Sequence, residues 1–532
     1  MPVQAALDAR WRSAQLHLRA GNATAAIADC EAIVAMDPRQ PAVWLTLANL
    51  AQGSGRFRVV VEHARMAAAA VHESRDWMPL ADIAMLLHGM GESRLAARAI
   101  IEADWADPLL LDAAGRLAQC LGLADFHDDA LRLLDRALAA GAPTPMLTYM
   151  RAMTLRHLGR SGEATAEYER CLALAPDYAA AMLMRTTHDR RTDTEAQIQR
   201  VRRALARNAQ DPTNAAMLHY ALFALLDGAA DAEGAWQALM QGAAIKRRSL
   251  SWQPARDEAR DAAIMALCRA PFLAAAPVVS AEQVPIFVVG QPRTGTTVLE
   301  RILGNHSEVA SGGELDDFHL QLCWQADILV GEFAHPALLQ ACPTLDFAAI
   351  GRGYLQRTSW RARGKRYLID KLPNNLFYAG LIHKALPQAR IVCLLRDPLD
   401  TCLSNLKELF AGDAYPYSYD PLEAAAHHLR VRRLLQHWDE VMPGVVLTVR
   451  YEDMVRDPLP VARAVMEHCG LPFEPDCVDL LRNAAPSATA SSSQVRQPLH
   501  TRGIGAWRRY AEGLAGARAL LEAHLPADAF AE

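Results

Sequence analysis

The pattern of hydrophobic and polar positions divides the chain into two halves of different character. Residues 1–270 are rich in Ala, Leu and Arg, with helical periodicity and almost no runs of β-branched residues. Short apolar runs typical of buried strands begin at 284–289 and recur at 367–369, 391–395 and 445–449. The pattern predicts an all-α half, 1–270, and an α/β half, 284–532. Residues 271–283, with two prolines and many small side chains, are predicted to connect them.

The N-terminal half contains internal repeats. A glycine is followed 17 residues later by a proline at Gly21/Pro38, Gly91/Pro108 and Gly159/Pro176. A repeat of roughly 34 residues is typical of the tetratricopeptide repeat (TPR), a helix-turn-helix unit. Segments 21–38 and 159–176 match its second helix, with a glycine at the turn and a small alanine that allows close helix packing.

We therefore expect about six or seven repeats stacked into a right-handed solenoid. Such arrays present a concave surface that commonly binds extended peptides or partner proteins. Two other roles stay open, since the array could instead form a homodimer or brace the second half.

The segment 284–297, VPIFVVGQPRTGTT, carries the most specific signal. A strand-like run ends at Gly290 and opens into a Gly/Thr loop, and an amphipathic helical pattern follows at 298–303. That order aims backbone N–H groups and a helix N-terminus at an anion. The spacing resembles the nucleotide-binding P-loop, except that Thr296 replaces the lysine that reaches the β- and γ-phosphates. Arg293 supplies a positive charge instead, which indicates a nucleotide that does not end in a γ-phosphate.

Five ordered motifs give the C-terminal half a family resemblance. They are PRTGTTVLERILGNHSEVASGGEL at 292–315, IDKLPNN at 369–375, VCLLRDPLDTCLSNLK at 392–407, VRYEDMVRDP at 449–458 and SSSQVRQPLHTRGIGAW at 491–507. From 284 to its end the chain resembles sulfotransferases that use 3′-phosphoadenosine 5′-phosphosulfate (PAPS). It is most similar to the tyrosylprotein type and to TPR-fused bacterial relatives. The resemblance implies an α/β P-loop-like domain with a central parallel sheet and flanking helices.

The resemblance also implies a cofactor site. It places Arg293, Thr294, Gly295, Thr296 and Thr297 around the 5′-phosphosulfate. Arg396 and Ser404, eight residues apart at a strand end and inside the next helix, match the family's 3′-phosphate pair. Tyr451 is expected near the adenine or the 3′-phosphate. The segment that closes over PAPS would contribute Ser491, Gln494, Val495 and Arg496, with the product 3′,5′-bisphosphate (PAP) in the same site. No metal is expected.

Catalysis of sulfuryl transfer needs fixed cations and a base for the acceptor hydroxyl. By motif matching, Glu314 stands where the tyrosylprotein type has its catalytic glutamate, and Arg293, Lys371 and Ser491 complete the expected catalytic set. Two of them have a simpler structural interpretation: Glu314 as a first-turn acid of a helix predicted at 315–329, and Lys371 as the ion-pair partner of Asp370.

The sequence departs from the family at several positions. Glu408 stands at the nominal position of an arginine, and Ala506 replaces a lysine, so Lys407, Arg502 and Arg508 are the available substitutes. The family's small-molecule members often use a histidine base. His306, His383, His427 and His428 lie in no motif that assigns them this role, which favours packing or surface roles.

Composition and charge bear on the cellular compartment and on the classes of partner that the chain could bind. A net charge of −5 gives no support for nucleic-acid binding. Ten scattered cysteines without metal-ligand spacing suit a reducing compartment. No window approaches 18 apolar residues, and the first residues contain no secretory signal, so we expect a cytoplasmic protein without a membrane span.

The sequence therefore predicts a PAPS-dependent sulfotransferase behind a TPR array, acting on a protein or peptide hydroxyl such as that of tyrosine. The array would help to bind the substrate or a partner. A P-loop kinase and a non-catalytic TPR scaffold are the rival hypotheses.

Overall fold

The computed structural model describes residues 2–188, 194–274, 282–483 and 497–531. Contacts divide the chain into two compact units. Unit 1 comprises residues 1–158 and 316–345, and unit 2 comprises 159–315 and 346–532. The predicted domain limits at 270 and 284 remain a prediction. The division by contacts places the helices of 159–270 in the same unit as the sheet.

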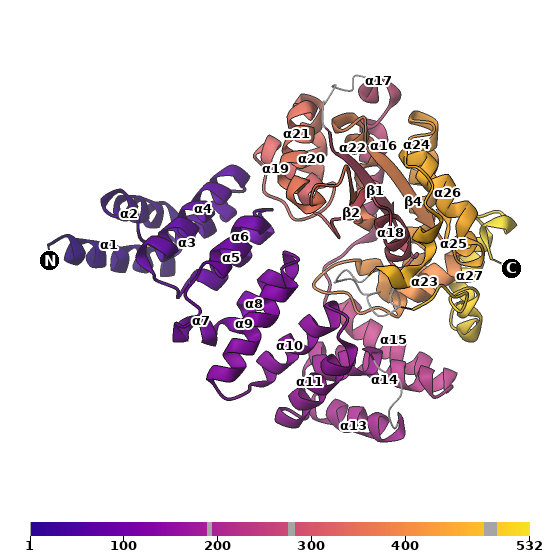
Figure 1. Ribbon diagram of the computed structural model, residues 1–532, viewed down its shortest axis with the longest axis horizontal. Helices are drawn as coiled ribbons and strands as arrows, with labels where there is room; N and C mark the ends of the chain where they lie inside the picture. Colours follow the sequence, from indigo (N-terminus) through magenta and orange to yellow (C-terminus); the bar gives the residue numbers. More distant parts are fainter. Residues whose placement is uncertain (1, 189–193, 275–281, 484–496, 532) are drawn as a thin grey trace. The chain divides into compact units, whose positions relative to one another are not determined.

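Unit 1 consists of helices. They are α1 (Pro2–Arg19), α2 (Ala23–Met36), α3 (Pro41–Gly53), α4 (Phe57–Ser74), α5 (Leu80–Gly89), α6 (Ser93–Ile101), α7 (Pro108–Asp112), α8 (Ala114–Leu123), α9 (His127–Ala140), α10 (Pro145–His157), α19 (Asp317–Ala326) and α20 (Pro336–Ala341). Antiparallel neighbours follow one another along the chain, as expected for helix-turn-helix repeats (Figure 1).

The helical region continues into unit 2. Its helices there are α11 (Ser161–Leu174), α12 (Ala179–His188), α13 (Thr194–Arg207), α14 (Pro212–Gly228), α15 (Ala232–Arg248), α16 (Pro254–Leu267) and α17 (Ala270–Leu273). The two segments predicted as second TPR helices both form helices, α2 and α11. Gly21 and Gly159 precede them with φ of 72° and 78°, and the small alanines of the two segments, Ala26 and Ala164, are buried, which is consistent with close helix packing.

The segment 316–345 packs on the repeats of unit 1. Phe57 at the start of α4 meets Trp324 edge-on at 6.3 Å between ring centroids, and the Leu329 N–H donates to the Gly55 carbonyl at 2.7 Å. The helix predicted at 315–329 is shorter than expected. It spans Asp317–Ala326, and the C-cap Asp327 ends it with a left-handed φ of 52°.

A five-stranded parallel sheet forms the centre of unit 2. Its strands are β1 (Val284–Gly290), β2 (Val309–Ser311), β3 (Tyr367–Asp370), β4 (Arg390–Leu395) and β5 (Val446–Arg450), in the order β2-β3-β1-β4-β5. The sequence predicted four of them. The short β2 was missed because three residues carry no recognisable periodicity. Ile286 pairs with Ile369 on one side of β1 and with Arg390 on the other.

Helices cover both faces of this sheet (Figure 1). The remaining helices of unit 2 are α18 (Thr296–Gly304), α21 (Phe347–Thr358), α22 (Ala379–Ala385), α23 (Pro398–Leu406), α24 (Pro421–Val441), α25 (Tyr451–Arg456), α26 (Pro458–Cys469) and α27 (Ala515–Glu522). Ile286 and Val288 pack with α18 and α26 on one face, while Phe287 meets Tyr354 of α21 on the other, at 5.5 Å. Because both faces are buried, β1 is a nearly unbroken apolar run.

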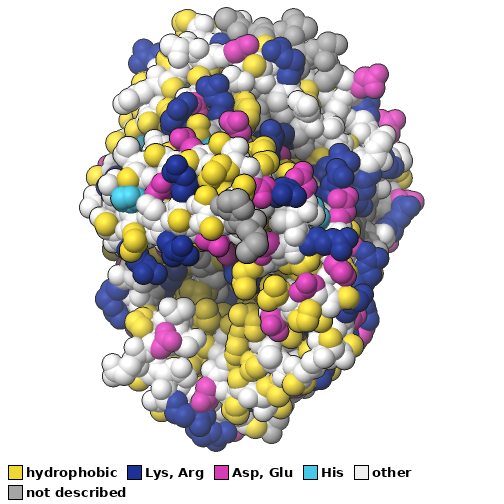
Figure 2. Space-filling view, turned by 90° about the vertical axis from the view of Figure 1, so that its left-hand side faces the viewer, with side chains coloured by type: hydrophobic (Ala, Val, Ile, Leu, Met, Phe, Trp, Pro, Cys, Tyr) yellow, Lys and Arg dark blue, Asp and Glu magenta, His cyan; other side chains and the backbone are white. Residues whose placement is uncertain are grey.

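On the face drawn in Figure 2, basic and acidic side chains are interspersed with hydrophobic and neutral ones, and neither sign of charge covers the face alone. All ten cysteines are buried thiols without a disulfide. Within the described ranges, no helix is both long and apolar enough to cross a bilayer.

Candidate functional site

The predicted site residues follow the carboxyl ends of neighbouring parallel strands. The loop with Arg293 leaves β1 at Gly290, Lys371 follows β3, Arg396 follows β4 and Tyr451 follows β5. Because the carboxyl ends of parallel strands meet at one edge of a sheet, these side chains gather where open α/β sheets bind ligands. The register of the sheet therefore assembles residues that are up to about 160 positions apart in the chain.

The loop between β1 and α18 is held in a defined shape. Arg293 has a left-handed φ of 67°, and Gly295, at the N-cap of α18, has a φ of 102°. The Thr294 hydroxyl donates to the Gln291 carbonyl at 2.8 Å, and Asn405 Nδ2 donates to the Pro292 carbonyl at 2.9 Å. The loop leads into the N-terminus of α18, with Thr296 and Thr297 buried in its first turn. This is an anion-binding geometry.

Arg396 lies against this loop. Its Nη1 donates to the Arg293 carbonyl at 3.1 Å, and its Nη2 donates to the Gly503 carbonyl. Its guanidinium carbon lies 4.7 Å from the centroid of the Tyr451 ring. Among the described residues, the buried Arg396 Nε has no hydrogen-bond partner. A buried cationic donor of this kind is suited to an anionic ligand.

Two glycines let Tyr451 approach the site. A Cβ on Gly295 would lie 2.5 Å from Tyr451 Cδ2, and a Cβ on Gly503 would lie 3.0 Å from the Tyr451 hydroxyl oxygen. The ring is therefore in close contact with both the loop and the C-terminal segment. Burial raises the pKa of Tyr451, so its hydroxyl stays protonated. Gly503 was missed by sequence reasoning, although it belongs to the quoted RGIG motif.

Lys371 and Glu314 form an ion pair at the end of β3. Lys371 is 1% exposed and its Nζ donates to Glu314 Oε1, whereas the Glu314 side chain is 46% exposed. The Lys371 N–H donates to the Gly313 carbonyl at 2.8 Å, which holds the two segments together. Asp370 instead accepts from the Tyr354 hydroxyl at 2.9 Å. Lys371 is thus paired with Glu314, and not with Asp370 as the alternative interpretation of the sequence expected. It also places Glu314 three residues before α19, outside that helix's first turn.

Glu300 is a further acid that sequence reasoning missed. It is buried in the second turn of α18, and Ser311 at the end of β2 donates its hydroxyl proton to Glu300 Oε1. Burial raises the pKa of this carboxyl, and the charge of Lys371 opposes the rise. An acid within an otherwise buried helical pattern was the available signal. No known motif drew attention to it.

The substitute basic residues contact other parts of unit 2. Lys407 Nζ lies 3.7 Å from Asp227 Oδ2, Arg502 donates to Gln497, and Arg508 donates to the Ala531 carbonyl. Glu408 Oε2 lies 3.8 Å from Arg293 Nε, so the acid that replaces the family's arginine faces the loop cation. Ser404 lies on α23 as predicted and is partly exposed. Ser491, Gln494, Val495 and Arg496 lie outside the described residues.

The histidines fit packing roles. His306 Nε2 bonds to the Pro472 carbonyl at 2.9 Å, and His427 stacks on Tyr417 at 3.5 Å between ring centroids. Burial lowers the pKa of His383 and lowers that of His428 to about 3. The described residues contain no group of His, Cys, Asp or Glu arranged to hold a metal ion.

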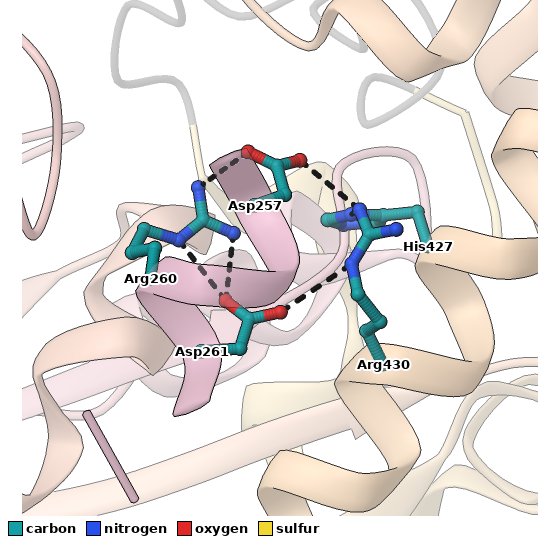
Figure 3. A network of polar contacts seen from close by, with 5 residues as sticks. All are labelled: Asp257, Arg260, Asp261, His427 and Arg430. Atoms are coloured by element: carbon teal, nitrogen blue, oxygen red, sulfur yellow. Dashed lines mark hydrogen bonds and ion pairs between the residues drawn. The ribbon is translucent and has the colours of Figure 1, made fainter. Parts of the chain in front are cut away.

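A buried ionic network joins α16 and α24 (Figure 3). Arg260 of α16 donates to Asp257 and Asp261. Arg430 of α24 donates to Asp257 and contacts His427 Nδ1 at 3.0 Å, and its Nε lies 3.4 Å from Asp261 Oδ2 as an ion pair. The Arg260 guanidinium lies 4.2 Å from the ring centroid of Phe377, in the 3-10 helix η3 (Pro373–Tyr378). The charges of two carboxylates balance those of two guanidinium groups, so the network can be buried and can hold η3 in place.

Known family models match a part of each region. Residues 285–475 match the Sulfotransferase family, and residues 148–178 match the tetratricopeptide repeat. The C-terminal half therefore carries a sulfotransferase-family domain, and a TPR precedes it. The kind of fold predicted from the sequence is confirmed.

Individual relatives match only parts of the chain. An "Uncharacterized protein" of Aquifex aeolicus (strain VF5) is 33% identical over 234 residues, which is 42% of this chain and 30% of that protein. A Caenorhabditis briggsae protein named "Putative protein-tyrosine sulfotransferase" is 22% identical over 227 residues, 42% of this chain and 80% of that protein. The match thus spans less than a third of the Aquifex protein.

Solved structures resemble parts of this chain, with low sequence identity and low TM-scores. The sulfotransferase domain from the curacin biosynthetic pathway covers 44% of this chain and 99% of its own, with 19% identity and a TM-score of 0.28. A tetratricopeptide repeat protein from Parabacteroides merdae covers 45% of this chain and 93% of its own, with 13% identity and a TM-score of 0.32.

Proposed function

We propose that this chain, whose C-terminal half carries a sulfotransferase-family domain, transfers a sulfuryl group from PAPS to an acceptor hydroxyl. The observation that carries the proposal is the carboxyl edge of the sheet. An anion-binding loop without the P-loop lysine lies there beside Arg396, next to a half-exposed acid paired with a buried lysine.

The residues present fit PAPS. The Arg396 Nε donor is buried without a partner among the described residues, and Gly295 and Gly503 leave room for Tyr451 at the site. Arg293 and the four residues after it would hold the 5′ end, and Arg396 with Ser404 would hold the 3′-phosphate. Thr296 in place of lysine favours this nucleotide over a triphosphate. We expect Ser491, Gln494, Val495 and Arg496 to complete the site.

When bound, PAPS supplies an activated sulfuryl group. Glu314 accepts the proton of the acceptor hydroxyl while that oxygen forms its bond to sulfur and the bond to the bridging phosphate oxygen breaks. Glu314 suits this role because it is open to solvent, and hence to an acceptor, on one side. Lys371 Nζ and Arg293 supply the fixed positive charge for the oxygens that gain negative charge. Burial strengthens the effect of Lys371, because water screens it less.

For the acceptor, we propose a protein or peptide hydroxyl, with tyrosine as the first candidate. The name of the 22% identical relative and the position of Glu314 support this choice. The TPR array would then bind the substrate or a partner, or a second copy of the chain. A reducing, cytoplasmic setting is supported by the ten buried thiols.

The decisive experiment measures transfer of labelled sulfate from PAPS to peptide, glycan and phenol acceptors. Peptide labelling that is lost when tyrosine is replaced by phenylalanine supports the full proposal. Labelling of only glycans or phenols would keep the reaction and change the acceptor class.

Ligand binding separates the rival hypotheses. We expect PAP to raise the thermal unfolding midpoint of the full chain, and ATP to raise it weakly, because the loop lacks the triphosphate lysine. Equal stabilisation by ATP would favour a kinase-like enzyme, and no stabilisation by either would favour a scaffold.

A further inference from the structure

Asp227 joins the repeat helices to two segments that adjoin the proposed cofactor site, the end of α23 and residues 509–510. It lies near the end of α14, and its side chain is 12% exposed. Its Oδ1 accepts from the Tyr510 hydroxyl at 2.7 Å and lies 3.3 Å from Arg509 Nη1, and its Oδ2 lies 3.7 Å from Lys407 Nζ. One largely buried carboxylate thus connects three elements that are distant in the sequence.

The surroundings of Asp227 form a closely packed contact. Trp236 of α15 stacks on the Tyr510 ring at 5.6 Å between centroids, and Lys407 Nζ lies 5.2 Å from the ring centroid of Phe223. A Cβ on Gly513 would lie 2.2 Å from Trp236, so the C-terminal segment fits against α15 only because glycine stands there. Such close packing, with charges partly removed from water, strengthens each polar contact.

The same face of α14 also meets the end of α23. The buried Tyr220 donates its hydroxyl proton to the Leu406 carbonyl at 3.0 Å, and Lys407 is the C-cap of α23. Tyr220, Phe223 and Asp227 are spaced i, i+3 and i+7, which places them on one face of the helix. The helix α14 therefore contacts the end of the helix that carries Ser404.

The C-terminal segment is attached to the site at successive points. The Gly503 carbonyl accepts from Arg396, and the Gly505 and Trp507 N–H groups donate to Asp400 of α23 at 2.7 and 2.9 Å. Tyr510 is attached to Asp227 at the far end. Because each contact lies within a few residues of the next, loosening one increases the freedom of its neighbours.

We propose that Asp227 is a positioning residue that holds residues 503–510 against α23 and so preorganises the cofactor site. The proposal rests on the proposed function, in that PAP must bind at Arg396 and Ser404. It assigns the last repeat helices a part in cofactor binding. A partner that displaced α14 would then weaken cofactor affinity through this carboxylate.

The test compares Asp227→Asn with Glu233→Gln in the full chain, since Glu233 is an exposed acid on the neighbouring helix α15. Titration calorimetry should show PAP affinity reduced on the order of tenfold in Asp227→Asn, through loss of charge-assisted contacts, and wild-type affinity in Glu233→Gln. Tyr510→Phe, which removes only the hydroxyl, should reduce affinity in the same direction, and the double variant should show less than the product of the two effects.

Hydrogen exchange without ligand gives an independent readout. Amides of residues 503–510 should exchange faster in Asp227→Asn, while those of the strands β1 and β4 should keep wild-type protection. In transfer assays, the KM for PAPS should rise by a larger factor than kcat falls.

The outcomes separate the two proposals. Unchanged exchange in 503–510, or PAP affinity equal to that of Glu233→Gln, would overturn the role of Asp227. Faster exchange throughout unit 2 would show a merely structural role and would also overturn it. A wild-type protein that does not bind PAP would remove the proposed function instead.

Discussion

Replacing Glu314 by glutamine tests the proposed mechanism most directly. The substitution keeps the size of the side chain and leaves an amide oxygen that can still accept the Lys371 hydrogen bond. It removes the negative charge and the capacity to take a proton from the acceptor. Because Lys371 is buried, removing the negative charge of its half-exposed partner should lower the free energy of unfolding by roughly 1–3 kcal/mol.

The expected loss of activity is larger than this loss of stability. A positioned general base contributes roughly 10²–10⁴ in rate, which corresponds to about 3–5 kcal/mol of transition-state stabilisation. PAP affinity should stay near wild type, because the loop and Arg396 are unchanged. A fall in kcat without a fall in PAP affinity therefore identifies a role in the chemical step.

The assay is single-turnover transfer of labelled sulfate from saturating PAPS, with PAP binding measured on the same samples. Glu308→Gln is the matched control, since Glu308 is an exposed acid just before β2. If Glu314 serves only as the ion-pair partner of Lys371, turnover should hold while the free energy of unfolding still falls. Full transfer activity in Glu314→Gln would refute the reasoning and redirect the search for a base to other residues.

Three further substitutions test the site. Arg396→Ala should weaken PAP binding by roughly 2–4 kcal/mol, because it removes charge-assisted contacts; unchanged affinity in calorimetry would remove Arg396 from the site. Gly295→Ala should lower the free energy of unfolding by about 1–3 kcal/mol, because of the φ of 102° and the contact at 2.5 Å with Tyr451, and urea unfolding at the wild-type midpoint would contradict it. The effect of Glu300→Gln on the free energy of unfolding depends on pH. Burial raises the pKa of the Glu300 carboxyl above its ordinary 4.5, so the wild type loses stability as pH rises from that value through the raised pKa. The thermal unfolding midpoint of Glu300→Gln minus that of the wild type should thus be larger at pH 7 than at pH 4. An equal difference at the two pH values would show that the ionised Glu300 carboxylate does not destabilise the folded protein.

Local sequence determined the elements and the kind of site. The apolar run ending at Gly290 dictates a buried strand, and the Gly/Thr loop after it dictates a turn into a helix, because these preferences act over a few residues. The repeat at about 34 residues likewise indicated helical pairs, since each pair repeats its own turn glycine and small packing residue. Arg293, Lys371, Arg396 and Tyr451 could be placed at strand ends for the same reason.

Only the tertiary structure decided how these residues are paired. Glu314 and Lys371 are 57 positions apart, and Arg396 and Gly503 are 107 positions apart, so no local pattern records their contacts. The buried Glu300, the short strand β2 and the link from Asp227 to Tyr510 were also invisible to local reasoning. Each depends on the order of strands in the sheet and on helix packing. Both arise from burial of apolar surface over the whole unit, and not from the preferences of neighbouring residues.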